Sequence, residues 1–468
     1  MACLLSACSF APPYKVPPSA PVPGVYKEAV GWKMSEPNDA APKGRWWSIF
    51  DDPWLNALED KAQNANQNLK AAFARLQQAR ADTRIARADL FPSLDATASA
   101  KRGRVSQNAP TYVKGYPTEG NDFVLEADLS YEIDLWGRVR NEVASARATQ
   151  QASAADLASI ALSIEAEVAT DYFGLRSYDT QRELLAKTVE DYAKSLKLTQ
   201  TLFEGGAAAL GDVAQAKSQL FSAQTQAADI DLLRAQLEHA IAVLVGENPS
   251  AFQMPVNPLP QTAAPPPVDP GIPSALLERR PDVAAAERRV SAANAQIGVA
   301  RAAYFPQFTL TGAAGLNSLH SSTWIDAPSL YWSIGPQAVL PIFEGGRLVA
   351  QTARAKAVYS EQVATYRNTV LTAYQDVEDN LAALRQLERE SETEAQAVEA
   401  TATFLQQSQD RYFAGIVTFL EVSTAETAAL QAQLSAINIR ARRLNAAVVL
   451  VKALGGGWRE ESASLGRN

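Results

Sequence analysis

The chain has 468 residues, 20% of them charged, and a formal net charge of −8. It offers no field of clustered Lys and Arg, so we expect no nucleic-acid partner. Only two His and two Cys occur, which leaves little material for a metal site of imidazole and thiolate ligands, and we expect no cofactor. No run approaches the roughly 18 apolar residues of a transmembrane helix, so a membrane crossing would have to use strands.

The amino terminus resembles a lipoprotein signal. Small residues, Ser6 and Ala7, precede Cys8 as at a lipoprotein signal peptidase site, and a Pro-rich stretch follows. We expect acyl chains on Cys8, with 1–7 as a signal-peptide remnant and the true translation start upstream, since a full signal peptide needs a basic region and a longer apolar stretch. Ser9 rather than Asp follows the Cys, which in the usual bacterial sorting pattern indicates the outer membrane. The alternative is an ordinary disordered start.

An internal duplication organises the chain. Ala-Arg-Ala and Phe-Pro recur at an offset of 214 residues, and Gly-Arg recurs at an offset of 209. The first copy therefore has about five extra residues between Phe-Pro and Gly-Arg, as a loop would tolerate. The expected domains are 1–7, the signal remnant; 8–53, a lipid-anchored tether; 54–250, the first repeat; 251–273, a linker; 274–458, the second repeat; and 459–468, a tail.

Long helices are predicted where proline is missing. No Pro occurs from Thr118 to Asn248 or from Ile342 to the end, and a helix interior rarely accepts one. The predicted helices cover 54–89, 138–204, 212–245, 282–303, 347–414 and 420–454. The two longest would each extend about 100 Å. Gly205, Gly206 and Gly415 end them, so each long helix and the next form a hairpin with a tight tip. Apolar residues from Val363 to Leu384, at spacings of three and four, predict a seam for a partner helix.

Four strands are predicted between the Phe-Pro and Gly-Arg pairs of the two copies, because the apolar period there changes to two. One strand alternates apolar residues from Phe123 to Leu135 with polar ones, and its polar face carries Glu126, Asp128, Glu132 and Asp134. Strands of about 9 to 11 residues cross a membrane as part of a β-barrel, but four strands cannot close one, so several chains must contribute. The acids would line a wet lumen that favours cations or zwitterions. The alternative is a soluble sheet packed against helices.

Several motifs together resemble the TolC/OprM family of outer-membrane efflux factors, and most closely its NodT-like lipoprotein branch. They lie at 46–47, 50–53, 134–138, 277–282, 286–287, 292–302, 305–306, 343–347 and 452–458. The resemblance covers the chain from Cys8 to Trp458. It implies an α+β membrane protein, a duplicated unit of long coiled-coil helices plus two transmembrane β-strands. Four strands from each of three chains would give a 12-stranded β-barrel above a 12-helix periplasmic α-barrel.

The resemblance also implies partners and sites. The homotrimer would be a passive duct without an energy source, anchored by outer-membrane lipid, fed by an inner-membrane RND transporter through a periplasmic adaptor, the membrane fusion protein. The adaptor would dock at the hairpin tips, here Gly205, Gly206, Ala208 and Gly415. The periplasmic gate would lie at the second tip.

This sequence departs from the branch at that gate. Phe413 stands at a position that is cationic in the branch, and Val417 and Thr424 replace acids. We therefore expect Tyr412, Phe413 and Leu420 to constrict the tunnel, with hydrogen bonding by Thr424, in place of a salt-bridge gate. Alternatively, Phe413 simply packs between helices, and the tip glycines only terminate helices.

Other functions share parts of this pattern. A TolC-type duct for type I protein secretion would have the same architecture, and a duct for metal export is a further alternative, although only three Met are present. A pore-free periplasmic scaffold would leave the alternating strands unexplained. An enzyme is disfavoured, because no nucleophile with a base at useful spacing occurs.

Overall fold

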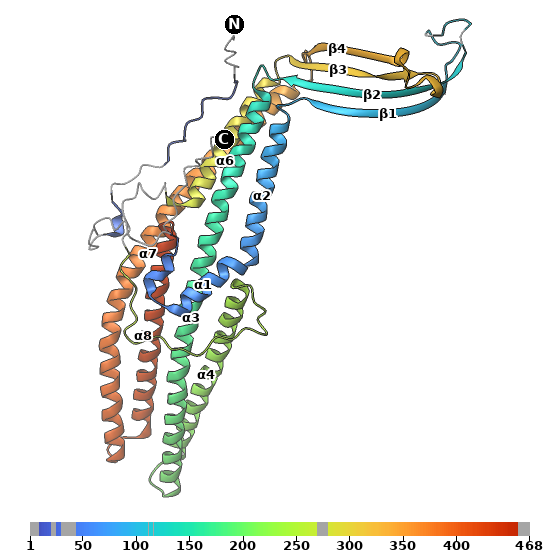
Figure 1. The fold of residues 1–468 in the computed structure, drawn as a ribbon. Coiled ribbons are helices and arrows are strands. Elements are labelled where there is room, and N and C mark those ends of the chain that lie inside the picture. Colours follow the sequence, from blue (N-terminus) through green and yellow to red (C-terminus); the bar gives the residue numbers. More distant parts are fainter. Residues whose placement is uncertain are drawn as a thin grey trace. The chain divides into compact units, whose positions relative to one another are not determined.

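The structure is a computed structural model that describes residues 9–19, 25–29, 44–110, 112–115, 117–268 and 279–456. Its helices and strands are shown in Figure 1. The predicted lipid attachment at Cys8, the signal remnant 1–7 and the tail 459–468 lie outside the described residues. Among the helices of the described ranges, none has a stretch long and apolar enough to cross a membrane.

The chain forms two compact units, and each draws on both sequence repeats. Unit 1 consists of Met1–Pro18, Ala74–Ala154 and Ala285–Arg367, and unit 2 of Ser19–Phe73, Ala155–Ala284 and Asn368–Asn468. The helices are α1 (Pro53–Ala65), α2 (Gln67–Ala88), α3 (Arg138–Glu204), α4 (Leu210–Leu244), α6 (Pro281–Ala302), α7 (Arg347–Phe413) and α8 (Phe419–Ala453). Short 3-10 helices occur at Lys27–Ala29, Trp46–Phe50, Ser321–Thr323 and Ala327–Ser329.

Unit 1 contains one antiparallel sheet of four strands in the order β1-β2-β3-β4. The strands are β1 (Ser93–Arg104), β2 (Glu119–Ile133), β3 (Gln307–Ser318) and β4 (Leu330–Val339). Figure 1 shows that the helices join the sheet at one end, whereas both hairpin turns lie at the other. The outer edges of β1 and β4 have no partner strand among the described residues.

The register brings the predicted alternations onto common faces. Leu94 pairs with Leu129, Leu129 with Gly312, and Gly312 with Ile334. Because paired residues point to the same side of a sheet, the apolar residues of all four strands share one face. Over the length of this apolar face, the opposite face carries the polar residues of the strands. The sheet is therefore amphipathic across its whole width.

An amino-terminal strap, residues 9–18, lies against unit 1. Phe10 stacks on Phe305 with ring centroids 4.3 Å apart, and its ring centroid lies 6.0 Å from that of Trp136. The Ser9 hydroxyl donates a hydrogen bond to Asn141 Oδ1 at 3.2 Å. These contacts hold the start of the strap close to the ends of the strands, where β2 leads into α3.

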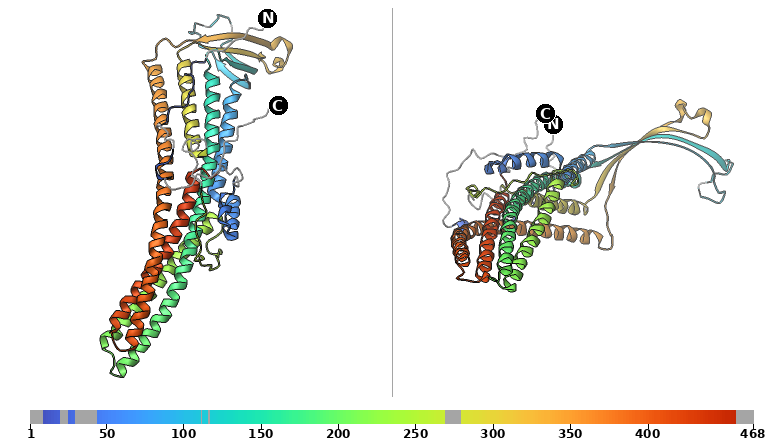
Figure 2. Two further views of the ribbon diagram at one scale, coloured as in Figure 1. Left: turned by 90° about the vertical axis from the view of Figure 1, so that its left-hand side faces the viewer. Right: turned by 90° about the horizontal axis from the view of Figure 1, so that it is seen from below.

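Unit 2 is a bundle whose hairpins, α3–α4 and α7–α8, lie side by side (Figure 2). Its core contains Trp47, Tyr172, Leu175 and Ile241, none of them exposed. The seam predicted along α7 is buried, since residues such as Val377 and Leu381 have no exposed surface. Burial of an apolar stripe along a helix is the main source of its stability in a bundle.

The predicted ends of the long helices agree with the structure to within two residues, but the single helix predicted over 54–89 is wrong. The chain leaves the helical conformation at Asn66, which has φ −58° and ψ 127° and separates α1 from α2. Asn66 Oδ1 accepts a hydrogen bond from Leu69 N at 3.0 Å, and its amide donates to Leu244 O at 2.8 Å. An Asn that caps the next helix and binds a distant carbonyl stabilises the break.

Candidate channel lining and gate

The polar face of the sheet concentrates carboxylates. The register places Asp95 opposite Asp128, with Thr97 opposite Glu126 in the neighbouring row. Asp122 pairs with Lys101, and its Oδ1 accepts a hydrogen bond from Asn317 Nδ2 at 2.7 Å. The lining predicted from the sequence includes Glu126 and Asp128 but omits Asp95 and Asp122. The same alternation of polar residues identifies Asp122 when it is followed toward the start of β2, and Asp95 when it is extended to the neighbouring strand β1.

Glu132 and Asp134 lie at the helix end of this face and have cationic partners. Arg138, the first residue of α3, contacts Glu132 Oε2 at 2.7 Å and Glu142 at 2.8 Å. Asp134 follows the last residue of β2 and accepts from Arg140 N at 2.9 Å and from Arg140 Nε at 3.0 Å. These two acids therefore anchor the start of α3, and their charges are partly neutralised.

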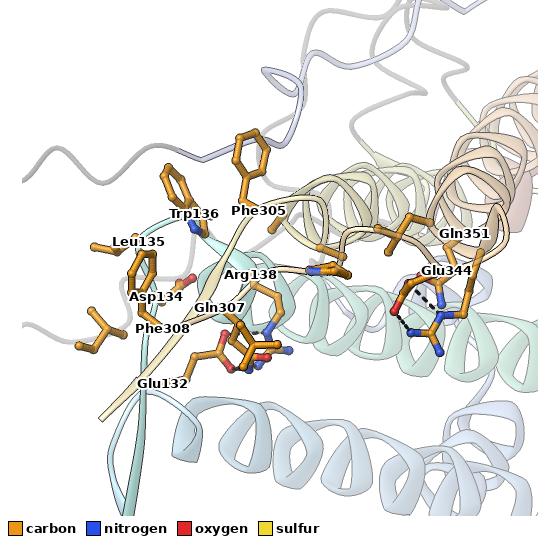
Figure 3. A pocket seen from close by; sticks show the side chains of 17 residues that line it. Glu132, Asp134, Leu135, Trp136, Arg138, Phe305, Gln307, Phe308, Glu344 and Gln351 are labelled. Atoms are coloured by element: carbon orange, nitrogen blue, oxygen red, sulfur yellow. Dashed lines mark hydrogen bonds and ion pairs between the residues drawn. The ribbon is translucent and has the colours of Figure 1, made fainter. Parts of the chain in front are cut away.

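A hollow of about 300 Å³ lies at the same junction (Figure 3). Acidic and aromatic side chains share its wall, and Trp136 Nε1 donates to Pro306 O at 2.7 Å beside it. Figure 3 shows Glu344 apart from Glu132 and Arg138. Glu344 precedes α7 and forms an ion pair with Arg347, the first residue of that helix. No group of three or more potential metal ligands was found among the described residues. The hollow therefore lies at the junction of strands and helices, with both charged and apolar side chains in its wall.

The first hairpin tip is built from small residues. Gly206 has φ +77°, which favours glycine, and Ala207 N donates to Leu202 O at 2.7 Å to end α3. Asp212 accepts from Ala209 N at 3.0 Å and so helps to begin α4. Ala207, Ala208 and Ala209 carry only methyl side chains, so an approaching helix meets little steric hindrance there, whereas Leu210 at the start of α4 is exposed to 67%.

The second tip has the same backbone turn and larger side chains. Gly415 has φ +69°, and Ile416 N donates to Arg411 O at 2.9 Å. Arg411 also forms an ion pair with Glu421 that closes the turn. Phe413 and Ile416 are exposed to 70% and 67%. The sequence prediction did not include the Arg411–Glu421 pair. A cation and an acid on the two sides of a tight turn would have been enough to predict an ion pair there.

The structure divides the four predicted gate residues. Phe413 and Leu420 are exposed, the latter to 62%. Tyr412 points inward instead, with its ring centroid 5.7 Å from that of the buried Phe419, and its hydroxyl is buried without a hydrogen-bond partner among the described residues. The Thr424 hydroxyl donates to Leu420 O at 2.8 Å, within its own helix. Of these four residues, only Phe413 and Leu420 thus present apolar side chains outward in a single chain.

Polar residues link the two hairpins above this tip. Gln219 of α4 donates to Ser423 O of α8 at 2.7 Å. Ser195 of α3 donates to Glu426 Oε1 at 3.2 Å, while Glu426 Oε2 is buried without a hydrogen-bond partner among the described residues. Burial, and secondarily the charge of Asp191, raises the pKa of Glu426 to about 7. The contact between α3 and α8 therefore contains a carboxyl group that titrates near neutral pH.

A second buried carboxyl lies in the unit 2 core. Glu59 has no exposed surface, and neither carboxyl oxygen has a hydrogen-bond partner among the described residues. Burial, followed by the charges of Glu165 and Asp60, raises the pKa of Glu59 to about 10. Glu165 accepts from Trp46 Nε1 at 2.9 Å and from Gln63 Nε2 at 2.9 Å, and burial raises its pKa as well. Glu59 is therefore a neutral acid in the fold.

Two long helical hairpins joined to an amphipathic sheet, with acids on one face and apolar residues on the other, define a channel-forming protein of the outer membrane. The family model described as outer membrane efflux protein matches residues 58–247 and 272–456. The chain is 34% identical over 442 residues to the pyoverdine export outer membrane protein OpmQ of Pseudomonas aeruginosa, covering 92% of this chain and 91% of the relative. It is 34% identical over 461 residues to the probable efflux pump outer membrane protein TtgC of Pseudomonas putida, covering 98% and 94%.

Solved structures give the same result. The outer-membrane channel OprN superposes with a TM-score of 0.89 at 29% identity, covering 96% of this chain and 100% of that one. The Campylobacter jejuni CmeC outer membrane channel superposes with a TM-score of 0.89 at 28% identity, covering 97% and 96%. The chain belongs to the outer membrane efflux protein family. It is an outer-membrane efflux protein with the helix-and-sheet fold of these channels.

Proposed function

We propose that three copies of this chain form a passive channel in the outer membrane, with a lipid on Cys8 of each copy. Four strands from each copy would close a 12-stranded barrel, and the helical hairpins would form a 12-helix periplasmic tunnel. The main support is the sheet itself. Its apolar face suits lipid, its acidic face suits water, and the open edges of β1 and β4 need partners, because backbone groups in hydrocarbon must be paired.

The tunnel would receive small molecules from an inner-membrane RND transporter through a periplasmic adaptor. Relatives named for efflux of toluene and antibiotics and for export of pyoverdine support small molecules as the cargo. In this role the chain needs no catalytic group. The carboxylates Asp95, Asp122, Glu126 and Asp128 would line the wet lumen and favour cations or zwitterions.

The hairpin tips would have two roles. Small residues at the first tip, including Gly205, Gly206 and Ala208, together with Gly415 at the second, would admit the adaptor. Exposed Phe413 and Leu420 of three copies would meet at the tunnel end and close it by apolar contact. Burial of apolar area contributes about 25 cal/mol per Å², so such a constriction resists water without charge pairs. Tyr412 would support the gate from inside by packing on Phe419.

Single-channel conductance in planar bilayers tests both the channel and the gate. The purified protein is expected to give low resting conductance, and the double variant Phe413→Ala/Leu420→Ala should raise it several-fold because the constriction widens. Phe221→Ala is a matched control, since this residue is also an exposed Phe, 59% accessible, but lies on α4 away from the tip. Unchanged conductance in the double variant would refute the gate, and a wild-type protein that never conducts would refute the channel.

A further inference from the structure

The far end of the β1–β2 hairpin changes character abruptly on one face. Leu94, Ala96, Ala98 and Ala100 follow one another on the apolar face of β1, and Ala100 pairs with Phe123. Because side chains alternate along a strand, Arg102 and Arg104 continue this face. The face therefore turns from apolar to cationic within two residues, about 7 Å along the strand.

Both arginines have side chains available to a ligand. Their side chains are 76% and 72% exposed. Each lies 3.9 Å from Glu119, at the limit of an ion pair, and this single exposed carboxylate faces two guanidinium groups. A net positive charge remains on a chain whose overall charge is −8.

The position of the pair matches the level of lipid headgroups. Ile133 and Phe123 mark the two ends of the apolar face on β2. The ten residue steps between them span about 34 Å along the strand. At a strand tilt of about 45°, this length crosses about 24 Å of membrane. Phe123 lies 5.4 Å from Trp324 by ring centroids, and aromatic residues concentrate at membrane interfaces. Arg102 and Arg104 lie one and two rows beyond Phe123, on the side away from the helices.

We propose that Arg102 and Arg104 bind the phosphate groups of lipids in the outer leaflet. The inference rests on the proposed function, in which the strands cross the outer membrane and the helices lie on the periplasmic side. A guanidinium group binds phosphate through parallel N–H donors, and two adjacent arginines present four or more such donors. The apolar face below them receives the acyl chains of the same lipid, so charge and apolar contact act together.

Lipid binding to the full-length protein, purified in detergent, tests the site by native mass spectrometry. The probes are lipid A carrying its phosphates, the same lipid with the phosphates removed, and inorganic phosphate as competitor. Arg102→Gln/Arg104→Gln is expected to lower bound phosphorylated lipid at least fivefold. Lys101→Gln is the matched control, because it removes a neighbouring positive charge from the opposite, polar face, and it should leave binding unchanged.

Three outcomes would overturn the proposal. These are equal lipid binding by wild type and the arginine double variant, equal binding of the dephosphorylated lipid, and displacement of the lipid by inorganic phosphate at similar concentration, which would indicate a free-anion site. If the double variant fails to assemble, Arg102→Lys/Arg104→Lys keeps the charge without the paired donors and should show a smaller loss. Binding as strong as wild type in that variant would contradict recognition by the guanidinium groups.

Conductance separates this proposal from the channel itself. Arg102→Gln/Arg104→Gln should conduct as the wild type does, since its substitutions face lipid, whereas Lys101→Gln should increase the preference for cations because it faces the lumen. A conducting protein that does not bind phosphorylated lipid would refute only the lipid site. A protein that does not conduct at all would refute the channel.

Discussion

The two hairpin tips share a backbone and differ in their side chains. Gly206 and Gly415 both have positive φ and both follow a helix of 67 residues. The first tip continues with three alanines, whereas the second carries Phe413, Ile416 and an ion pair. The turn needs a residue with positive φ, and both copies kept a glycine there. The exposed side chains around the two turns diverged after the duplication. Under the proposed function, this difference would assign closure to the second tip and most of the docking surface to the first.

The largest expected effect comes from enlarging the first tip. Ala208→Trp should abolish most efflux in cells, because a bulky ring at the tip prevents close approach of an adaptor helix, but the resting conductance of the purified channel should not change. Growth in the presence of a panel of dyes, antibiotics and detergents measures efflux. An Ala208→Trp channel with altered conductance and normal efflux would contradict the assignment of docking to the first tip and closure to the second.

Substitution of the tip glycines should affect both tips alike. A β-branched residue at positive φ is strained, so Gly206→Val and Gly415→Val should each lower the free energy of unfolding by about 1–2 kcal/mol. Gly205→Ala serves as control, because Gly205 does not have positive φ. Thermal unfolding in detergent measures the change. A large loss of unfolding free energy for only one of the two variants would show that positive φ is not required equally at the two tips.

The second hairpin carries a buried acid, Glu426, where α8 contacts α3. The folded-state pKa of Glu426 is raised to about 7 from an ordinary 4.5, so its stabilising contribution is complete below pH 4.5 and is lost as the pH rises through about 7. Glu426→Gln should therefore make stability less dependent on pH between 5 and 8. Thermal unfolding across this range is the measurement, with Glu421→Gln as a control acid near the same tip. Parallel pH curves for wild type and Glu426→Gln would contradict the assignment.

The smallest effect is expected for the ion pair at the second tip. Arg411 and Glu421 have side chains 49% and 29% exposed, and pairs of this kind contribute about 0–1 kcal/mol. Their coupling in a double-mutant cycle with Arg411→Gln and Glu421→Gln should be small and should fall with added salt. Coupling above about 2 kcal/mol would show that a charge pair, rather than apolar contact, holds this tip.

Local patterns in the sequence predicted the long helices and the strands. The strand β2 follows from the alternation of apolar and polar residues from Phe123 to Ile133, and the helices α3 and α7 follow from the absence of proline. Neither pattern depends on residues far away in the chain. The break at Asn66 could not be predicted in this way, because it depends on the carbonyl of Leu244, 178 residues away. The inward orientation of Tyr412 likewise depends on Phe419, across the turn.

Charged residues were the hardest to place from sequence. Glu132 and Asp134 follow the same alternation as Glu126 and Asp128, yet Arg138 and Arg140 of the following helix bind them. Glu59 and Glu426 lie in helices where an acid normally faces water, and both are buried. Periodicity indicates which face an acid shares, but its partner and its burial follow from tertiary packing.

The strap has a consequence for the proposed lipid anchor. Ser9 is bound to Asn141 and Phe10 is stacked on Phe305, so the first described residues are fixed beside the inner rim of the apolar face. An acyl group on the preceding residue would enter the bilayer at the level where the strands do. The acyl group would then fix the depth of the sheet in the membrane. A lipid on a long flexible tether would not constrain that depth.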